Sequence, residues 1–285
     1  MVCQNGHLDI AEMLIKNSTK INIELNAKDT FGKTAFHLAC KYGHLNVAEM
    51  IMEKSTKFNI EVNAKDGDGM TAFHLACVNG HSKIAEILIK KSAEPNLDLN
   101  AKEQTLGMTA FHMVCRNGHS MIAEILINKS RQFNIELNTK GCNGMTAFHW
   151  ACKNGHPDIT KMLIQNSTKI NIVLNAKDIF GMTALHVACE NGDSMIVEML
   201  IQKSIKFNIQ LNVKDGNGMT AFHWACRDGH TAIVKIMIDN SESFGLHLRL
   251  RDTDGKSGFQ LAEQFQQTDT INLIKRKMPK IAEYK

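Results

Sequence analysis

The feature that constrains this chain most is an internal repeat. The pattern Thr-Ala-x-His recurs six times, and its threonines are spaced by 37, 38, 37, 37 and 37 residues. They are Thr34, Thr71, Thr109, Thr146, Thr183 and Thr220. An eroded copy begins at Ser257, and residues 2–7 match the end of a truncated one. Units this short cannot bury a core alone, so the sequence predicts a stack of repeats in which each unit packs on its neighbours.

Each period predicts a hairpin followed by two helices. In the unit that begins at Asp66, glycine and aspartate over residues 66–69 are typical of a hairpin tip. Thr71 can cap a short helix that ends at Asn79-Gly80. A second helix follows, because its apolar residues recur at helical spacing, at Ile84, Ala85, Leu88 and Ile89.

The string Gly-x-Thr-Ala-Phe-His-Leu-Ala-Cys-x-x-Gly-His, followed by Ile-Ala-Glu-x-Leu-Ile and Leu-Asn-Ala-Lys-Asp, resembles the ankyrin repeat. The resemblance covers essentially the whole chain and implies an all-α solenoid with β-hairpin loops. The expected units are a truncated repeat 1–28, full repeats 29–65, 66–102, 103–140, 141–177, 178–214 and 215–251, and a degenerate capping repeat 252–285. Alanine follows the threonine where the family usually has proline, which exchanges a preset φ for helix propensity.

The repeats are also about four residues longer than the family period of ~33. The additional residues precede each hairpin, and Lys57-Phe58-Asn59-Ile60-Glu61-Val62-Asn63 alternates apolar and polar residues. This alternation predicts an extended segment with Phe58, Ile60 and Val62 on one side. We expect it to cover the ends of the second helices; an edge dedicated to a partner is the alternative.

Cysteine and histidine are explained by the repeat. Seven of the eight cysteines share one register, and twelve of the thirteen histidines fall in two registers. Stacked helices lie ~8–10 Å apart, too far for disulfides between equivalent positions, so we expect buried free thiols and a reducing compartment. The stacking also separates His-x-x-Cys pairs such as His37 and Cys40, which argues against zinc. The resemblance implies that the first histidine bonds the threonine hydroxyl and the backbone across repeats, for example His74 with Thr71.

Other chemistry finds no support in the sequence. A formal net charge of +4 is too small to indicate an arm that binds nucleic acid. No phosphate loop, metalloprotease motif or nucleophile elbow is present in the sequence. We therefore expect no enzyme activity, no cofactor and no metal. The repeated asparagines, such as Asn63 and Asn100, stand where related ankyrin proteins can be hydroxylated, although stabilisation of the hairpin explains them equally.

Partner binding is expected at positions that the repeat leaves variable. By similarity to the family these are the hairpin tips and the exposed side of the first helix. Apolar tip residues can anchor a partner or fold onto the adjacent hairpin, and the residues before each threonine form either a pliable apolar strip or padding between hairpins. The predicted contact residues are Phe31, Lys33, Tyr42, Met70, Leu106, Met108, Arg116, Met145, Lys153, Phe180, Met182, Met219 and Arg227.

The sequence therefore predicts a non-catalytic protein-interaction scaffold that is monomeric and binds one or more proteins. No small-molecule substrate, nucleic acid or membrane span is expected, and the expected location is intracellular, in the cytoplasm, with the nucleus as the alternative. The repeat region of a larger signalling protein, such as an ion channel, a kinase or a ubiquitin-ligase adaptor, is the alternative function. The truncated first repeat leads us to expect that the natural polypeptide continues upstream.

Overall fold

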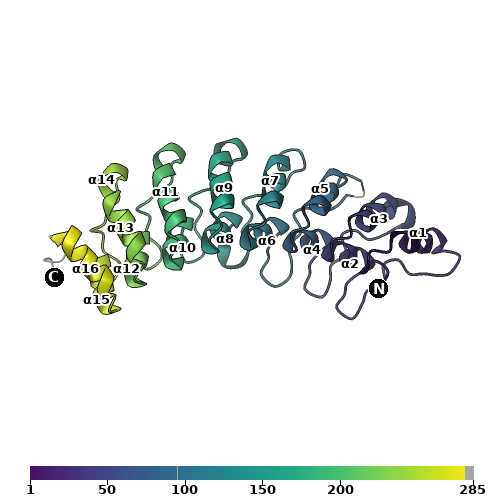
Figure 1. The fold of residues 1–285 in the computed structure, drawn as a ribbon, viewed down its shortest axis with the longest axis horizontal. Coiled ribbons are helices and arrows are strands. Elements are labelled where there is room, and N and C mark those ends of the chain that lie inside the picture. Colours follow the sequence, from purple (N-terminus) through teal and green to yellow (C-terminus); the bar gives the residue numbers. More distant parts are fainter. Residues whose placement is uncertain (95, 280–285) are drawn as a thin grey trace. The chain divides into compact units, whose positions relative to one another are not determined.

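Helices and turns make up the fold of the computed structural model, which describes residues 1–94 and 96–279. The chain divides into two compact units, Met1–Cys142 and Asn143–Lys285. The first holds α1 (Leu8–Asn17), α2 (Ala35–Lys41), α3 (Leu45–Phe58), α4 (Ala72–Val78), α5 (Ser82–Lys90), α6 (Ala110–Asn117) and α7 (Ser120–Lys129). Within it, α2, α4 and α6 form one row and α3, α5 and α7 form a second (Figure 1).

The second unit repeats the arrangement. The 3-10 turn η1 (Cys142–Gly144) straddles the boundary between the units. It is followed by α8 (Ala147–Lys153), α9 (Pro157–Ile170), α10 (Ala184–Asn191), α11 (Ser194–Phe207), α12 (Ala221–Arg227), α13 (Thr231–Asp239), α14 (Ser241–Phe244), α15 (Gly258–Gln264) and α16 (Thr268–Lys277). First helices pack on first helices here, as α10 does on α8 and α12. The all-α stack of two-helix repeats that the sequence predicts is confirmed within each unit.

The predicted hairpins are tight turns without β-strands over the described residues, where a single bridge joins Arg251 and Ser257. Backbone hydrogen bonds close the tips, such as Asp66 N–H to the Met70 carbonyl at 2.9 Å and Gly69 N–H to the Asp66 carbonyl at 3.0 Å. Successive tips are joined by another, such as Gly67 N–H to the Phe31 carbonyl at 2.9 Å. The tips therefore form a row of turns joined by backbone hydrogen bonds, and each turn is too short to form a β-strand.

The segment after the second helix differs from its sequence prediction. Helix α3 continues through Phe58 and ends at Asn59, which takes the left-handed conformation (φ 51°). The extended conformation predicted from Lys57 is therefore wrong for its first three residues, because Lys57 and Phe58 are helical and the left-handed Asn59 caps their helix. Beyond Asn59, Ile60 is half-buried and Val62 is buried.

A ladder of asparagines joins the repeats at the left-handed turns that follow the second helices. The Asn63 amide nitrogen donates to the Asn96 carbonyl at 2.8 Å, and its oxygen accepts the Asp98 N–H at 2.8 Å. The same pair of bonds recurs at Asn26, Asn100, Asn175 and Asn212. Each asparagine thus fixes the left-handed turn of the following repeat.

Candidate functional site

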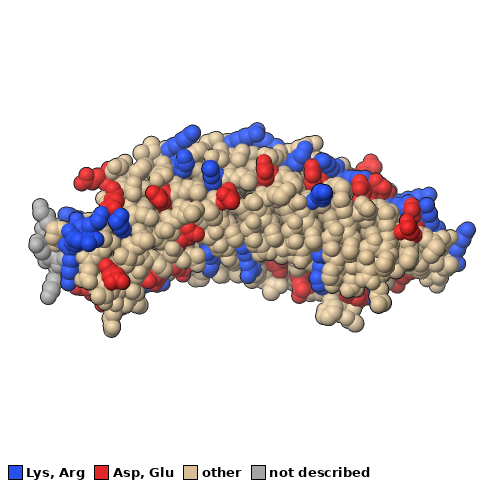
Figure 2. Space-filling view, viewed as in Figure 1, with Lys and Arg blue, Asp and Glu red and all other residues tan. Residues whose placement is uncertain are grey.

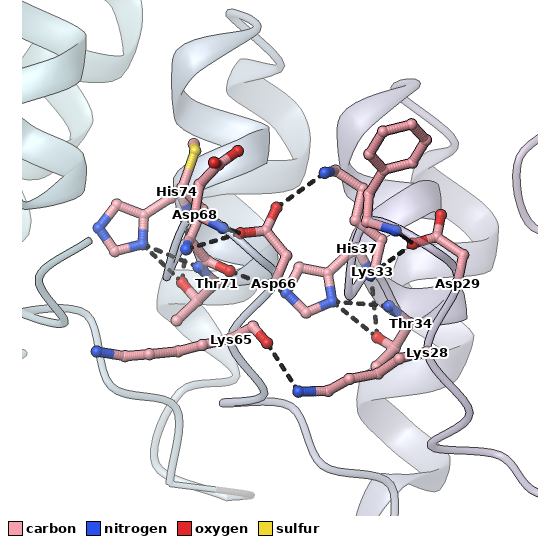
Figure 3. Close-up of polar contacts among 12 residues, drawn as sticks. Lys28, Asp29, Lys33, Thr34, His37, Lys65, Asp66, Asp68, Thr71 and His74 are labelled. Carbon is pink, nitrogen blue, oxygen red and sulfur yellow. Dashed lines mark hydrogen bonds and ion pairs between the residues drawn. The ribbon is translucent and has the colours of Figure 1, made fainter. Parts of the chain in front are cut away.

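The Thr-Ala-x-His pattern is a structural cap. In Figure 3, the Nδ1 atom of His74 accepts the backbone N–H of Thr71 at 3.2 Å and lies 2.9 Å from its hydroxyl. Because Nδ1 accepts an amide N–H, a neutral ring carries its proton on Nε2, which points to the Met108 carbonyl at 3.3 Å. The predicted histidine bonds to the threonine and across repeats are confirmed at this position.

The histidines of this pattern are buried within the repeats. His37, His74, His186 and His223 are buried, and burial lowers their pKa below the usual value of a histidine. The structure therefore keeps their rings neutral, as the cap requires. Their fixed bonds make them parts of the scaffold.

Six of the seven cysteines that share one register are buried as the sequence predicts, whereas the seventh, Cys3, is only half-buried. Cys40, Cys77, Cys115, Cys152, Cys189 and Cys226 are buried and free. Burial raises the pKa of the Cys152 thiol to about 12. The same cause raises the pKa of the Cys77 and Cys189 thiols further. Among the described residues no group of three or more His, Cys, Asp or Glu side chains is placed to hold a metal ion.

The tips carry the most exposed apolar residues among the predicted contacts. Phe31 is 70% exposed and Phe180 is 56% exposed. Each follows an aspartate whose Oδ1 accepts two tip amides, as Asp29 does from Phe31 and Lys33 at 2.9 and 2.8 Å. These bonds hold the turn in one conformation, so the aromatic rings are presented on stiff tips.

The predicted methionine strip is wrong as a surface. Met108, Met145, Met182 and Met219 are only 1–7% exposed. Each precedes a capping threonine, and the carbonyls of Met108, Met182 and Met219 lie at hydrogen-bond distance from the preceding repeat's histidine, so this register points into the stack. These side chains pad the space between turns, which was the alternative interpretation, and Met70 is the one methionine of this register that is half-buried.

Four predicted contact residues, Met70, Leu106, Met108 and Arg116, do converge in the first unit. With Asp68, Val78, Glu103, Thr105, Met113 and Asn117 they line a hollow of about 340 Å³ between the tips and first helices of repeats 66–102 and 103–140. Its floor is apolar, and Asp68 and Arg116 lie on its exposed rim. We call this the tip hollow.

An irregular tip builds the hollow. The spacing of 38 residues between Thr71 and Thr109 places one additional residue in the tip that begins at Glu103. The five other full repeats have a tip that is one residue shorter. The longer glutamate compensates, because its carboxylate accepts the amides of Thr105, Leu106 and Met108 at 2.6, 2.6 and 2.9 Å. Desolvation is the largest single effect and raises the pKa of Glu103, but the hydrogen bonds together outweigh it and leave the pKa below its usual value. The sequence signal for this site is the single step of 38 residues between Thr71 and Thr109.

The remaining predicted residues do not join the hollow. Tyr42 is exposed at the end of α2, and Lys153 is exposed at the end of α8. Lys33 forms an ion pair with the buried Asp66 at 3.1 Å (Figure 3). Arg227 stacks on Trp224 at 3.9 Å and pairs with Asp228. Lys33 and Arg227 thus make contacts within the fold in addition to lying at its surface.

The Trp224 contact was missed in the sequence. Its indole N–H donates to Oδ2 of Asp215 at 2.9 Å, while Oδ1 of the same carboxylate accepts the Asn217 and Met219 amides. Trp224 is 9% exposed, so the ring is packed into the stack. Nine residues separate the two partners, and the repeat pattern alone does not pair them.

Charge is mixed over most of the face drawn in Figure 2. The densest gathering of Lys and Arg there lies at the C-terminal end, where the last turn of α16 carries Lys275, Arg276 and Lys277. Lys277 pairs with Asp239. No helix within residues 1–94 and 96–279 combines the length and the apolar character needed to cross a membrane.

Comparison with known proteins agrees with the repeat geometry. A family model of ankyrin repeats in three copies matches residues 1–98, 95–178, 131–215, 170–252 and 205–281. The chain belongs to the ankyrin-repeat family. Curated protein sequences show no match to it.

Among solved structures, the ankyrin repeat domain of Bcl-3, described as a unique member of the IκB protein family, is similar in fold. The likeness covers 86% of this chain and 99% of that domain, with a TM-score of 0.70. At 19% identity it shows the ankyrin fold alone.

Proposed function

We propose that this ankyrin-repeat chain is a non-catalytic interaction scaffold that binds a protein partner through the tip hollow. The observation that carries the proposal is the convergence of Met70, Leu106, Met108 and Arg116 on one cavity of about 340 Å³. Cavities of 300–1,000 Å³ with apolar walls and a few polar groups are typical binding sites. Ankyrin repeats serve as protein-interaction modules, which supports the same assignment.

The chemistry of the hollow fits one bulky apolar side chain of a partner. Met70, Val78 and Met113 supply adaptable apolar walls. Asp68 is exposed, and its carboxylate suits a cationic neighbour on the partner. A second contact is supplied by the stiff Phe31 tip, because an exposed aromatic ring on a fixed turn loses little entropy on binding.

Site-specific photocrosslinking tests this function. A photoreactive phenylalanine is placed at Leu106 in the hollow, or at Met121, which is 67% exposed on α7 and serves as the matched control. We expect position 106 to crosslink a partner in native extract that position 121 does not reach. Equal crosslinking from both positions, or none from 106, would contradict the proposal.

A charge variant supplies the second arm. Leu106→Glu places a carboxylate in the apolar hollow and should abolish the crosslink-defined complex, whereas Met121→Glu should retain it. Both positions are at least partly exposed, so both variants should keep the helical circular-dichroism signal.

A further inference from the structure

The edge of the second unit that carries the asparagine ladder has an unbalanced charge. Three loop segments, 173–177, 210–214 and 247–251, lie side by side there, because ladder bonds join each segment to the next. Their exposed cations are Lys177, Lys214, Arg249 and Arg251. We call these four residues the basic edge.

The first unit repeats the same loop segments with balanced charge. There an acid stands two residues before each ladder asparagine and four residues before each lysine. The acids are Glu24, Glu61, Asp98 and Glu136, and the lysines are Lys28, Lys65, Lys102 and Lys140. In the second unit the acidic register holds Val173, Gln210 and His247 instead. Both units therefore have a row of cations, but only the second unit leaves that row without acids in the neighbouring register.

The acid and the lysine of a first-unit loop are close enough to interact. The Ala64 N–H donates to the Glu61 carbonyl at 3.2 Å, and such a turn brings the two α-carbons to within about 7 Å. Lys65 is the next residue, so it lies about 10 Å from Glu61, the distance over which charges interact at 0.1 M salt. The same turn occurs at Val173, whose carbonyl accepts the Ala176 N–H at 3.2 Å, but it brings no carboxylate near the cations.

Backbone carbonyls hold the cations of the basic edge in place. Lys177 Nζ donates to the Lys214 carbonyl at 3.1 Å, and Lys214 Nζ donates to the Arg251 carbonyl at 2.7 Å. Because an ammonium group has three donors, Lys214 can keep this bond and bind a carboxylate at the same time. A side chain that is already held loses less entropy when a partner binds.

The tip aspartates beside the basic edge are already engaged. Asp178, Asp215 and Asp252 each follow a cation, and Oδ1 of each accepts two amides of its own tip. Asp29 and Asp66 make the same bonds in the first unit. These aspartates are therefore common to both units and do not account for the difference in charge.

The spacing of the cations matches one peptide conformation. Stacked helices lie about 8–10 Å apart, and each repeat contributes one cation at the lysine register. A polyproline II segment has three residues per turn and rises about 3.1 Å per residue, so every third side chain recurs on one face about 9 Å further on. A β-strand would turn alternate carboxylates away. A nucleic-acid strand has a phosphate about every 3.4 Å along the axis, so about two phosphates in three would meet no cation.

We propose that the basic edge binds an acidic segment of a partner protein in the polyproline II conformation, with a carboxylate on every third residue. The carboxylates pair with Lys177, Lys214 and Arg251, and Arg249 adds a cation beside this row. The exposed Gln210 donates to a backbone carbonyl of the segment, because polyproline II has no internal hydrogen bonds. The basic edge lies in the second unit and the tip hollow in the first, so either assignment can fail alone.

The probe is a fluorescein-labelled peptide of four Glu-Pro-Pro copies, the spaced peptide, titrated with the full chain and followed by fluorescence anisotropy. We expect saturable binding at about 0.1 M salt. A block peptide with the four glutamates first and the eight prolines after them has the same charge without the spacing, and should bind about threefold more weakly or worse. Equal binding of the two peptides overturns the match of spacing, and no binding of the spaced peptide overturns the proposal.

Charge reversals locate the surface. Lys214→Glu should weaken binding of the spaced peptide about fivefold or more. Lys65→Glu removes the equivalent bond in the first unit, to the Lys102 carbonyl at 2.9 Å, and should leave binding unchanged. Leu106→Glu in the tip hollow should also leave it unchanged. Equal losses from Lys214→Glu and Lys65→Glu overturn the assignment to the second unit.

Variants of the acidic register test the reasoning without altering a cation. Val173→Glu combined with Gln210→Glu, both at exposed positions, gives the second unit the acids of the first and should weaken binding as Lys214→Glu does. Unchanged binding overturns the role of the register.

The converse variant should create a second site. Glu24→Gln, Glu61→Gln and Asp98→Asn together remove acids from the first unit and keep the size of each side chain. We expect isothermal titration calorimetry to detect a second equivalent of the spaced peptide, and a single equivalent overturns the control of binding by this register. Displacement of the spaced peptide by a single-stranded DNA oligonucleotide of equal length, at a lower concentration than unlabelled peptide requires, overturns a protein partner in favour of nucleic acid.

Discussion

The carboxylate of Asp215 holds more of its repeat together than its equivalents do. Its oxygens accept the Asn217 and Met219 amides at 2.8 and 2.9 Å and the Trp224 indole N–H at 2.9 Å. Asp178 accepts only the two corresponding tip amides, at 2.9 and 2.8 Å. Asp215→Ala and Asp178→Ala therefore differ by one buried bond to tryptophan.

The expected cost follows from what each substitution leaves behind. Each tip amide that loses its carboxylate acceptor costs about 1 kcal/mol, or about 2 kcal/mol for Asp178→Ala. The Trp224 indole is buried, and an unpaired buried donor costs about 1–3 kcal/mol more. We expect Asp215→Ala to destabilise its repeat by about 4 kcal/mol.

Amide hydrogen exchange is the appropriate assay, because repeat stacks can open locally and exchange reports the opening free energy of one helix. The amides of α12 report on Asp215→Ala, and those of α10 report on Asp178→Ala. In a Trp224→Phe background, which removes the donor, the cost of Asp215→Ala should fall to about that of Asp178→Ala. Equal costs for the two aspartates in the unaltered chain would refute the assigned role of the indole bond.

Three further predictions concern the repeat framework. The chain should lose stability as pH falls below about 6.5, the unperturbed pKa of histidine, because burial lowers the pKa of His37, His74, His186 and His223 and the unfolded chain therefore binds more protons. The free energy of unfolding should fall by up to about 1.4 kcal/mol per histidine per pH unit, and a Tm that is flat from pH 7 to 5 would contradict this prediction. Asn175→Ala removes two bonds to the next repeat and should cost about 1–3 kcal/mol by urea unfolding, whereas Asn154→Ala, whose amide bonds its own helix at 3.0 Å, should cost less. Thiol labelling of the native chain should reach Cys3 and Cys142 first, and rapid labelling of the six buried cysteines would show that the stack opens readily.

The sequence predicted the fold well because the repeat pattern records packing directly. The Thr-His cap and the cysteine seam recur at fixed registers, and the structure places them where the period requires. Errors arose where two periodicities meet. Phe58 belongs to α3, although it also continues the alternation of Ile60 and Val62, and only the left-handed Asn59 decides where the helix ends.

The candidate site was predicted less completely. Register assigned Met145 and Met182 to a surface, but the depth of a side chain depends on how the next turn packs over it. Met70 was predicted as part of the methionine strip and Leu106 as an apolar tip residue, without any indication that the two meet. Their meeting depends on the additional residue after Glu103, whose effect on a turn is a matter of three-dimensional geometry.

The asparagine ladder has a consequence for how such a chain can change over evolutionary time. Each rung runs from one repeat to the left-handed turn of the next in the same direction, so every internal 37-residue segment begins and ends on identical bonding partners. Duplication or deletion of one whole period restores every rung. The chain can therefore gain or lose whole repeats. Insertions or deletions of one or two residues break the register of these bonds and are confined to the tips.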